Sequence, residues 1–148
     1  MPMAIELVVT PTGLELCLTG IDRAAAGRRG LHVPFERIVG SRTMSRADAV
    51  ASSPRLPCPG LWCPGRIRTG SWGIGERRQL WAVRGGADVV VVYLSGRPFH
   101  RLVVETGDCR RTQRSVEAAL LHSKRTAARA SLRAVLRGRD GERAPSRR

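Results

Sequence analysis

Two cysteines have a spacing that zinc ligands use. Cys58 and Cys63 are separated by four residues in a stretch rich in Pro and Gly, the kind of loop found in zinc knuckles. A structural zinc needs four ligands, and no second pair lies nearby in the sequence. The remaining candidates would have to approach through the fold: Cys17, Cys109, His32 and His100. We favour a pair of loop thiols, reduced or adventitiously oxidised, and expect no metal or other cofactor.

Catalytic chemistry has no recognisable pattern in this chain. His32, His100 and His122 have no carboxylate or nucleophile at motif spacing, so we interpret them as structural or surface residues. The glycines between positions 70 and 75 do not open a helix, as the glycines of a phosphate-binding loop do. We therefore expect a protein that is not an enzyme and has no small-molecule substrate.

Arginine dominates the charge. The chain has 26 Lys and Arg residues against 12 Asp and Glu, for a net charge of +14, and Lys124 is its single lysine. This preference for Arg is typical of GC-rich coding, which explains the residue type but not the excess of positive charge. Residues 1–106 carry +6 and residues 107–148 carry +8, so the smaller segment holds the larger share. Such a balance favours an anionic partner.

A first group of arginines precedes and follows an expected hairpin turn. Its members are Arg66, Arg68, Arg77 and Arg78, with Trp62 and Trp72 close in sequence. Guanidinium groups pair with phosphate and indole rings favour a membrane interface, so this group suits lipid headgroups. The alternative is that Trp72 and Trp81 fill the core while the arginines form a solvated rim, and we favour that alternative because Trp is usually buried.

A second group of basic residues lies near the C-terminus. It consists of Lys124, Arg125, Arg129, Arg133 and Arg137. A helix would align the four arginines in one stripe, opposite or beside Leu132, Val135 and Leu136, and such a helix can lie on anionic lipid or along nucleic-acid phosphates. Like charges four residues apart repel each other, which favours a frayed or disordered tail without a partner, so the extension is expected to be helical or disordered. A solubilising extension is the alternative.

The first part of the chain predicts short strands. Residues 5–10 and 14–18 flank Pro11-Thr12-Gly13 and read as a hairpin whose second strand buries Leu14, Leu16 and Leu18. Residues 31–33 and 35–44 predict further strands, with a break at Pro34. Ser45 is a candidate N-cap for a helical turn over residues 46–51. The four prolines between positions 54 and 64 predict a loop that joins no sheet.

A meander is expected next. Residues 66–72, 79–84, 89–94 and 99–105 read as four strands joined by short turns that contain Gly. Consecutive strands with short links pair antiparallel, because a parallel neighbour needs a long crossover. A helix follows, with Asp108 as its N-cap and with Thr112, Val116, Ala119 and Leu120 on the face toward the sheet.

Several local features resemble a known family. They are the run Val33-Pro34-Phe35-Glu36-Arg37-Ile38-Val39-Gly40, then Pro59-Gly60-Leu61, Pro64-Gly65, Gly70-Ser71-Trp72, Gln79-Leu80-Trp81-Ala82-Val83, residues 89–94 and Arg101-Leu102-Val103-Val104-Glu105. Over residues 1–121 the chain resembles small actinobacterial proteins of the bacterial pleckstrin-homology-like domain type, a largely uncharacterised group. The resemblance implies a mainly β (α+β) fold, a barrel of about seven antiparallel strands capped by one C-terminal helix. The Cys58/Cys63 pair and the long basic tail depart from that family.

These observations combine into one expectation. Residues 1–122 should form the pleckstrin-homology-like domain and residues 123–148 a basic extension. No secretory signal and no apolar run of about 18 residues is present, which predicts a cytoplasmic protein, peripheral at the membrane if lipid is its ligand. The expected function is a non-enzymatic binding or scaffold module that docks on an anionic membrane surface or an acidic protein. The alternative is a protein that binds nucleic-acid phosphates non-specifically through its tail.

Overall fold

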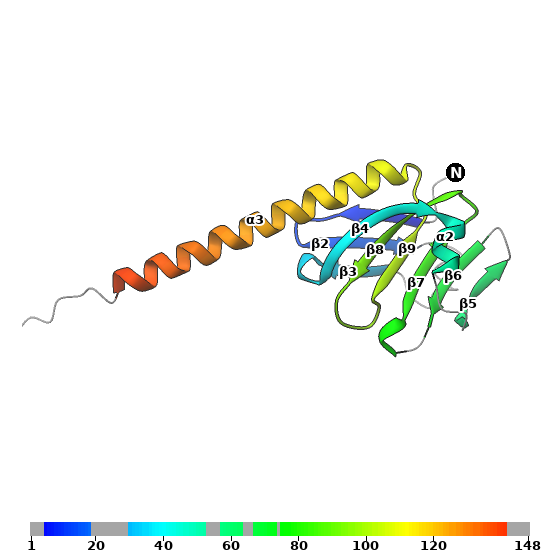
Figure 1. The fold of residues 1–148 in the computed structure, drawn as a ribbon, viewed down its shortest axis with the longest axis horizontal. Coiled ribbons are helices and arrows are strands. Elements are labelled where there is room, and N and C mark those ends of the chain that lie inside the picture. Colours follow the sequence, from blue (N-terminus) through cyan, green and yellow to red (C-terminus); the bar gives the residue numbers. More distant parts are fainter. Residues whose placement is uncertain (1–4, 19–29, 53–56, 64–66, 74, 142–148) are drawn as a thin grey trace, which may run out of the picture.

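The computed structural model describes residues 5–18, 30–52, 57–63, 67–73 and 75–141, with the backbone alone for 57–63, 67–69, 140 and 141. Within these ranges nine strands form two sheets, and a long helix follows them (Figure 1). The strands are β1 (Ile5–Val9), β2 (Gly13–Leu18), β3 (Gly30–Pro34), β4 (Ile38–Ser45), β5 (Pro57–Cys63), β6 (Ile67–Trp72), β7 (Gln79–Val83), β8 (Asp88–Leu94) and β9 (Arg101–Val104). The helical elements are η1 (Phe35–Arg37), α2 (Arg46–Ala51), η2 (Gly75–Arg77) and α3 (Cys109–Gly141).

The smaller sheet has the order β1-β2-β3 and is antiparallel throughout. The expected N-terminal hairpin is confirmed, with Ile5 opposite Leu18 and Val9 opposite Leu14. Leu14, Leu16 and Leu18 of β2 are buried while Glu15 is exposed, as the alternation predicts. The break at Pro34 is a short 3-10 turn, η1, that separates β3 from β4.

The larger sheet has the order β4-β8-β9-β7-β6-β5, and this order corrects the expected meander. β6 and β7 pair antiparallel, as do β8 and β9. However, β9 lies between β7 and β8 and runs parallel to β7, so the strands that the Gly85-Gly86 link joins are not neighbours. The prediction that all strands are antiparallel is therefore wrong for this pair.

Glu105 holds the short link that joins β7 to β8 past the end of β9. The link from β7 to β8 passes the end of β9, where Glu105 follows. The backbone amides of Arg84 and Gly86 donate to Oε2 of Glu105 at 2.7 and 2.9 Å, and the amide of Glu105 donates to the Ala82 carbonyl at 2.9 Å. One carboxylate thus accepts from two amides of this link, a long-range contact that spacing along the chain does not reveal.

The proline-rich stretch also differs from the prediction. Instead of a loop that joins no sheet, residues 57–63 form β5, which pairs antiparallel with β6 at the edge of the larger sheet. The register shifts between Pro57 and Gly60. An edge strand needs ladder bonds on only one side, so it tolerates the missing N–H groups of prolines.

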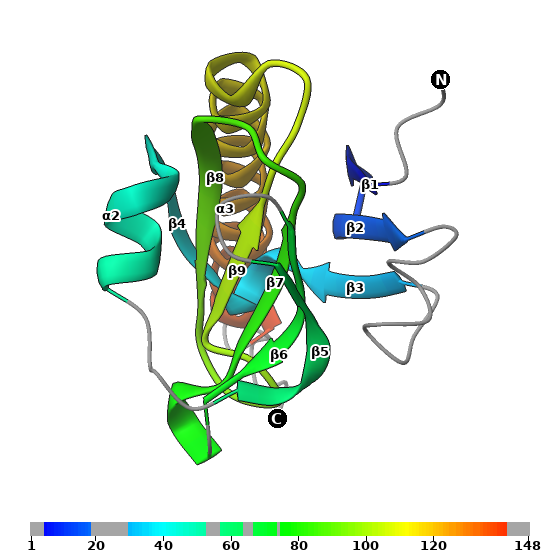
Figure 2. The same cartoon turned by 90° about the vertical axis from the view of Figure 1, so that its right-hand side faces the viewer.

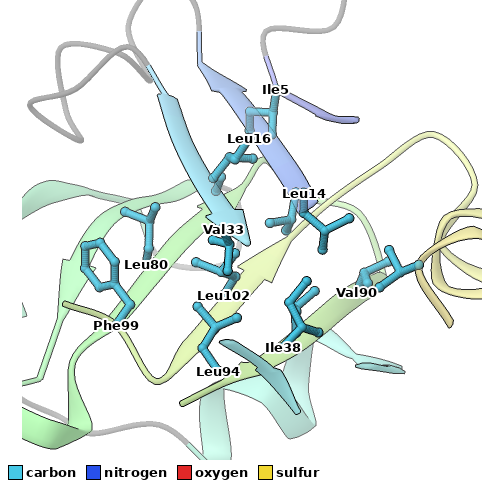
Figure 3. Close-up of a cluster of buried hydrophobic side chains, with 14 of the residues drawn as sticks. Ile5, Leu14, Leu16, Val33, Ile38, Leu80, Val90, Leu94, Phe99 and Leu102 are labelled. Carbon is cyan, nitrogen blue, oxygen red and sulfur yellow. The ribbon is translucent and has the colours of Figure 1, made fainter. Parts of the chain in front are cut away.

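The main core lies between the two sheets (Figure 3). Side chains of β1, β2 and β3 face those of β7, β8 and β9 from the larger sheet, and Val116 and Leu120 of α3 close one side. The labelled members in Figure 3 are Ile5, Leu14, Leu16, Val33, Ile38, Leu80, Val90, Leu94, Phe99 and Leu102. This arrangement places sheet against sheet and leaves the other face of the larger sheet to a second cluster.

The second cluster lies beneath α2, on the side of the larger sheet opposite β1–β3 (Figure 2). It contains Ala49 of α2 and the apolar residues of one sheet face: Trp72, Trp81, Val83, Val89, Val91 and Val103. Ser45 caps α2 as expected, since its Oγ accepts from the Asp48 amide at 3.1 Å. Strands β7 and β9 and most of β8 are therefore buried on both faces of the larger sheet.

The expected barrel is only partly matched. The strands fold as an α+β protein with a C-terminal helix, but they are nine rather than about seven, and no ladder among the described strands joins the two sheets into a closed barrel. Asp108 caps α3 as expected, because its Oδ1 accepts from the Arg111 amide at 2.9 Å. None of the described helices has the length and apolar character needed to cross a membrane.

Candidate functional site

The first turns of α3 attach it to the sheets. Val116 and Leu120 are buried in the main core, and the half-buried Glu117 accepts from the amide and the hydroxyl of Ser41 at 2.8 and 2.7 Å. Thr112 and Ala119, the other members of the expected face, are half-buried, and Arg110, Arg111 and Arg114 point outward. The predicted packing face is confirmed for the first three turns.

Beyond these turns the helix leaves the sheets (Figure 1). At about 1.5 Å per residue its 33 residues span about 50 Å, much of it past the last contact with the core. From Leu121 to Arg139 every side chain is exposed except the half-buried Ser123. We call residues 123–141 the distal helix. The segment predicted to be helical or disordered is helical to Gly141, and residues 142–148 lie outside the described ranges.

All charged residues of the distal helix up to Arg139 are basic. Six of its residues from Ser123 to Arg139 are Lys or Arg, and none is Asp or Glu. The predicted residues Lys124, Arg125, Arg129, Arg133 and Arg137 are all exposed, as is Arg139. Each step of four residues rotates the side chain by about 40° around the axis, so the four arginines from 125 to 137 form a slowly winding row. The row presents charge along one side of the rod.

Apolar side chains lie beside this row. Leu121 is 51% exposed, Leu132 61%, Val135 59% and Leu136 51%. Successive side chains of a helix are about 100° apart around its axis. By this rule the mean direction of these four side chains is about 130° away from that of Val116 and Leu120. These four residues, which we call the apolar stripe, are therefore a second face and not a continuation of the one that packs on the sheets. Three of these residues, Leu132, Val135 and Leu136, were recognisable from the sequence, but their rotation away from the packing face was not.

The first predicted arginine group is spread along the β6–β7 hairpin. Arg66 lies outside the described residues, and Arg68 is opposite Trp62 in the β5–β6 ladder, where only the backbone is described. Arg77 and Arg78 are exposed and lie at the other end of the hairpin, next to the Trp72–Gln79 pair. The two ends of this ladder, at Arg68 and Trp72, are four residue steps apart, or about 13 Å. The turn thus does not bring these arginines to one point.

Arg78 has a structural role as well as an exposed charge. Its guanidinium lies over the ring of Phe99, 5.4 Å from the centroid, and its carbonyl accepts from the His100 amide at 2.9 Å. Trp72 and Trp81 are buried in the second cluster, which supports the interpretation that they fill the interior. The interior that they fill is beneath α2 and not between the sheets.

The cysteines do not form a described metal site. Cys58 and Cys63 lie on β5, whose side chains are outside the description. Cys17 and Cys109 are half-buried free thiols. Burial, and then the nearby charges of Glu15 and Glu6, raises the pKa of Cys17 above its ordinary value of 9.0. Within the described ranges no three His, Cys, Asp or Glu residues are arranged to hold a metal ion.

Arg101 is a buried cation that the sequence analysis did not single out. It lies on β9 and is only 4% exposed, with Tyr93 and Gln79 as its register partners on β8 and β7. Its Nη1 donates to Ser52 Oγ at 3.0 Å, and burial lowers its pKa below the usual value for Arg. The available signal was a single Arg at the start of an otherwise apolar run, Arg101-Leu102-Val103-Val104, in a strand buried on both faces.

Comparisons with known proteins add no further guide to the site. No protein-family model matches the chain, and neither the curated proteins nor the solved structures contain a significant match.

Proposed function

We propose that this protein is a non-enzymatic binding module that docks on an anionic membrane surface through the distal helix. The observation that carries the proposal is the combination on one rod of an exposed row of arginines and an exposed apolar stripe. An amphipathic basic helix of this kind lies in the plane of a lipid interface, with its apolar side chains below the headgroups and its cations among them. The protein would then be cytoplasmic and peripheral at the membrane.

The apolar stripe favours lipid over nucleic acid. Phosphates on a nucleic-acid backbone are contacted by Arg and Lys and need no leucines, whereas a lipid interface accommodates both. Leu132, Val135 and Leu136 are each more than half exposed, an arrangement that costs free energy in water and is offset when they enter an apolar layer. An acidic protein with an apolar groove is the competing partner.

Charge supplies most of the expected affinity. Each basic residue near a charged bilayer contributes about 1 kcal/mol, so three arginines together contribute about 3 kcal/mol, or about 100-fold in the partition coefficient. Binding also removes the repulsion between arginines four residues apart, which weakens the distal helix in water. The association should therefore be sensitive to salt.

The domain that carries this helix is proposed to be of the actinobacterial pleckstrin-homology-like type. Support comes from two packed sheets followed by a C-terminal helix, in the element order that the resemblance implies. The parallel β7–β9 pair and the lack of a ladder between the described sheets depart from the antiparallel barrel that the resemblance implies. Its role would be to hold the helix at the surface and to present other partners to it.

Vesicle co-sedimentation tests the docking proposal. The full chain is mixed with neutral phosphatidylcholine vesicles or with vesicles containing phosphatidylserine, at low and high salt. We expect binding only to the anionic vesicles, and a loss of about 100-fold in a variant with Arg125, Arg129 and Arg133 changed to Gln. The matched control changes Arg110, Arg111 and Arg114 to Gln, which removes the same charge from the same helix and should bind nearly as the wild type does.

A second variant separates the partners. Leu132→Gln with Leu136→Gln should weaken vesicle binding and leave any retardation of a DNA or RNA duplex unchanged. Equal losses in the two arginine variants would show that net charge alone is responsible and would refute the assignment to the distal helix. Retardation of nucleic acid without vesicle binding would favour the nucleic-acid alternative, and binding of an acidic polypeptide without vesicle binding would favour a protein partner.

A further inference from the structure

Arg101 is a buried cation in the larger sheet. It is 4% exposed and lies on the face of the larger sheet that α2 covers, among Tyr93, Met44 and Ser52. No acidic side chain of the described residues contacts its guanidinium. A buried cation usually has an acidic partner, because removing it from water is otherwise strongly unfavourable.

The oxygen contacts of Arg101 are all made by one nitrogen of its guanidinium group. Nη1 donates to Ser52 Oγ at 3.0 Å and to the Ser52 carbonyl at 3.4 Å, so this nitrogen caps the C-terminal end of α2. Nη2 contacts only the Met44 sulfur, at 3.5 Å, and a thioether is a weak acceptor. Nε is buried and has no hydrogen-bond partner.

The side left without an oxygen acceptor is the one that recognises oxyanions. Nε and Nη2 point in the same direction, and together they form the two parallel hydrogen bonds with which Arg holds a carboxylate or phosphate. Arg37 and Arg46 also have one buried unpartnered nitrogen each, but neither residue is buried as a whole. Within the described ranges Arg101 thus combines full burial with an open bidentate edge.

The guanidinium lies close to the surface despite its burial. Ser52, its partner at the C-cap of α2, is exposed, and Met44, which contacts Nη2, is half-buried. Met is unbranched and has three rotatable bonds, so its side chain can turn aside without a change in the backbone. Displacing it would open the Nε–Nη2 edge toward solvent.

We propose that Arg101 anchors a binding site for a small oxyanion, a phosphate or carboxylate group, which replaces the Met44 sulfur at the Nε–Nη2 edge. The anion supplies the two strong acceptors that the edge lacks and neutralises the buried charge. Ser52 keeps Nη1 in place, so the guanidinium is already oriented when the anion enters. This site is independent of the distal helix and takes single small anions, not an extended surface.

Anion-dependent stability of the full chain tests this site. Thermal unfolding is followed in phosphate, acetate or chloride at equal ionic strength. We expect phosphate or acetate to stabilise the chain beyond chloride, with the unfolding equilibrium constant falling about tenfold at ten times Kd. Met44→Ala should lower the concentration needed, because it opens the edge, and the more effective anion identifies the ligand class.

Arg101→Lys keeps the charge but lacks the bidentate edge, so the excess stabilisation by oxyanions should disappear. The variant with Arg125, Arg129 and Arg133 changed to Gln is the control for anions bound by the distal helix and should keep that stabilisation. The ¹⁵N resonance of Arg101 Nε provides a readout in the unmodified protein and should shift on titration with the same anion. An unshifted resonance, or equal stabilisation in Arg101→Lys, would overturn the proposal and leave Arg101 as a cap of α2 alone.

Discussion

Ending the chain at His122 should leave the two-sheet domain as stable as it is in the full chain, although this removes more than half of α3. The reason lies in what the removed residues contact. From Lys124 to Arg139 every side chain is exposed, and among the removed residues whose side chains are described only Ser123 is half-buried. The buried residues of the helix, Val116 and Leu120, stay in place.

The magnitude follows from burial. Removing exposed side chains changes the free energy of unfolding by about 0.5 kcal/mol or less. Leu120→Ala in the full chain is the matched comparison, because Leu120 is 4% exposed and belongs to the main core. Truncating a buried leucine lowers the free energy of unfolding by about 2 to 5 kcal/mol. Leu120→Ala alone should thus lower the free energy of unfolding more than removal of the entire distal helix does.

Urea unfolding measures both changes in the same assay. Trp72 and Trp81 are buried in the second cluster, so their fluorescence reports the larger sheet, while circular dichroism at 222 nm reports helix. In the full chain we expect part of the helical signal to fall before the fluorescence changes, because the distal helix has no core contacts and like charges weaken it. In the shortened chain the two signals should coincide. A truncation that lowers stability as much as Leu120→Ala would refute the assignment of a free distal helix.

Three further perturbations address the sheets and the thiol. Gly13→Ala places a Cβ against the Val33 carbonyl oxygen and should lower the free energy of unfolding by about 2 kcal/mol in urea titration. Glu105→Ala removes the acceptor of two loop amides and should cost about 2 kcal/mol in the same assay, whereas Glu105→Gln, which keeps a carbonyl acceptor, should cost less. Cys17 has a raised pKa in the folded state, so its protonated thiol stabilises the fold below pH 9.0 and that stabilisation is lost as pH rises through the folded-state value. The urea midpoint should therefore fall as pH rises above 9.0 in the wild type, and less in Cys17→Ser.

Local signals predicted the elements where a short segment determines its own structure. The N-terminal hairpin, the cap of α2 by Ser45 and the cap of α3 by Asp108 all depend on residues within a few positions of each other. The strand order depended instead on Glu105, which binds amides of residues about twenty positions earlier. The composition of the Gly85-Gly86 link is equally compatible with a simple hairpin, so the sequence alone could not show that β9 is inserted.

Among the candidate functional residues, too, the sequence predicted some and missed others. The spacing of Arg125, Arg129, Arg133 and Arg137 indicated a row of charge, and the exposed helix presents it. The sequence did not reveal the role of Arg101, because that role depends on its burial and on the lack of a contacting carboxylate among the described residues. Both are properties of the packed sheet. A strand pattern marks where a residue lies along the chain but not which groups surround it.

The rotation between the two faces of α3 bears on how the protein can act. Leu120 faces the core and Leu121 faces solvent, about 100° apart around the axis, at the point where the helix leaves the sheets. Had the apolar residues kept the direction of Val116 and Leu120, the distal helix would present a face suited to packing on more of its own domain. Because Leu132 and Val135 point elsewhere, a membrane surface can bury them while the proximal turns remain packed. The proposed docking would then require no rearrangement of the core.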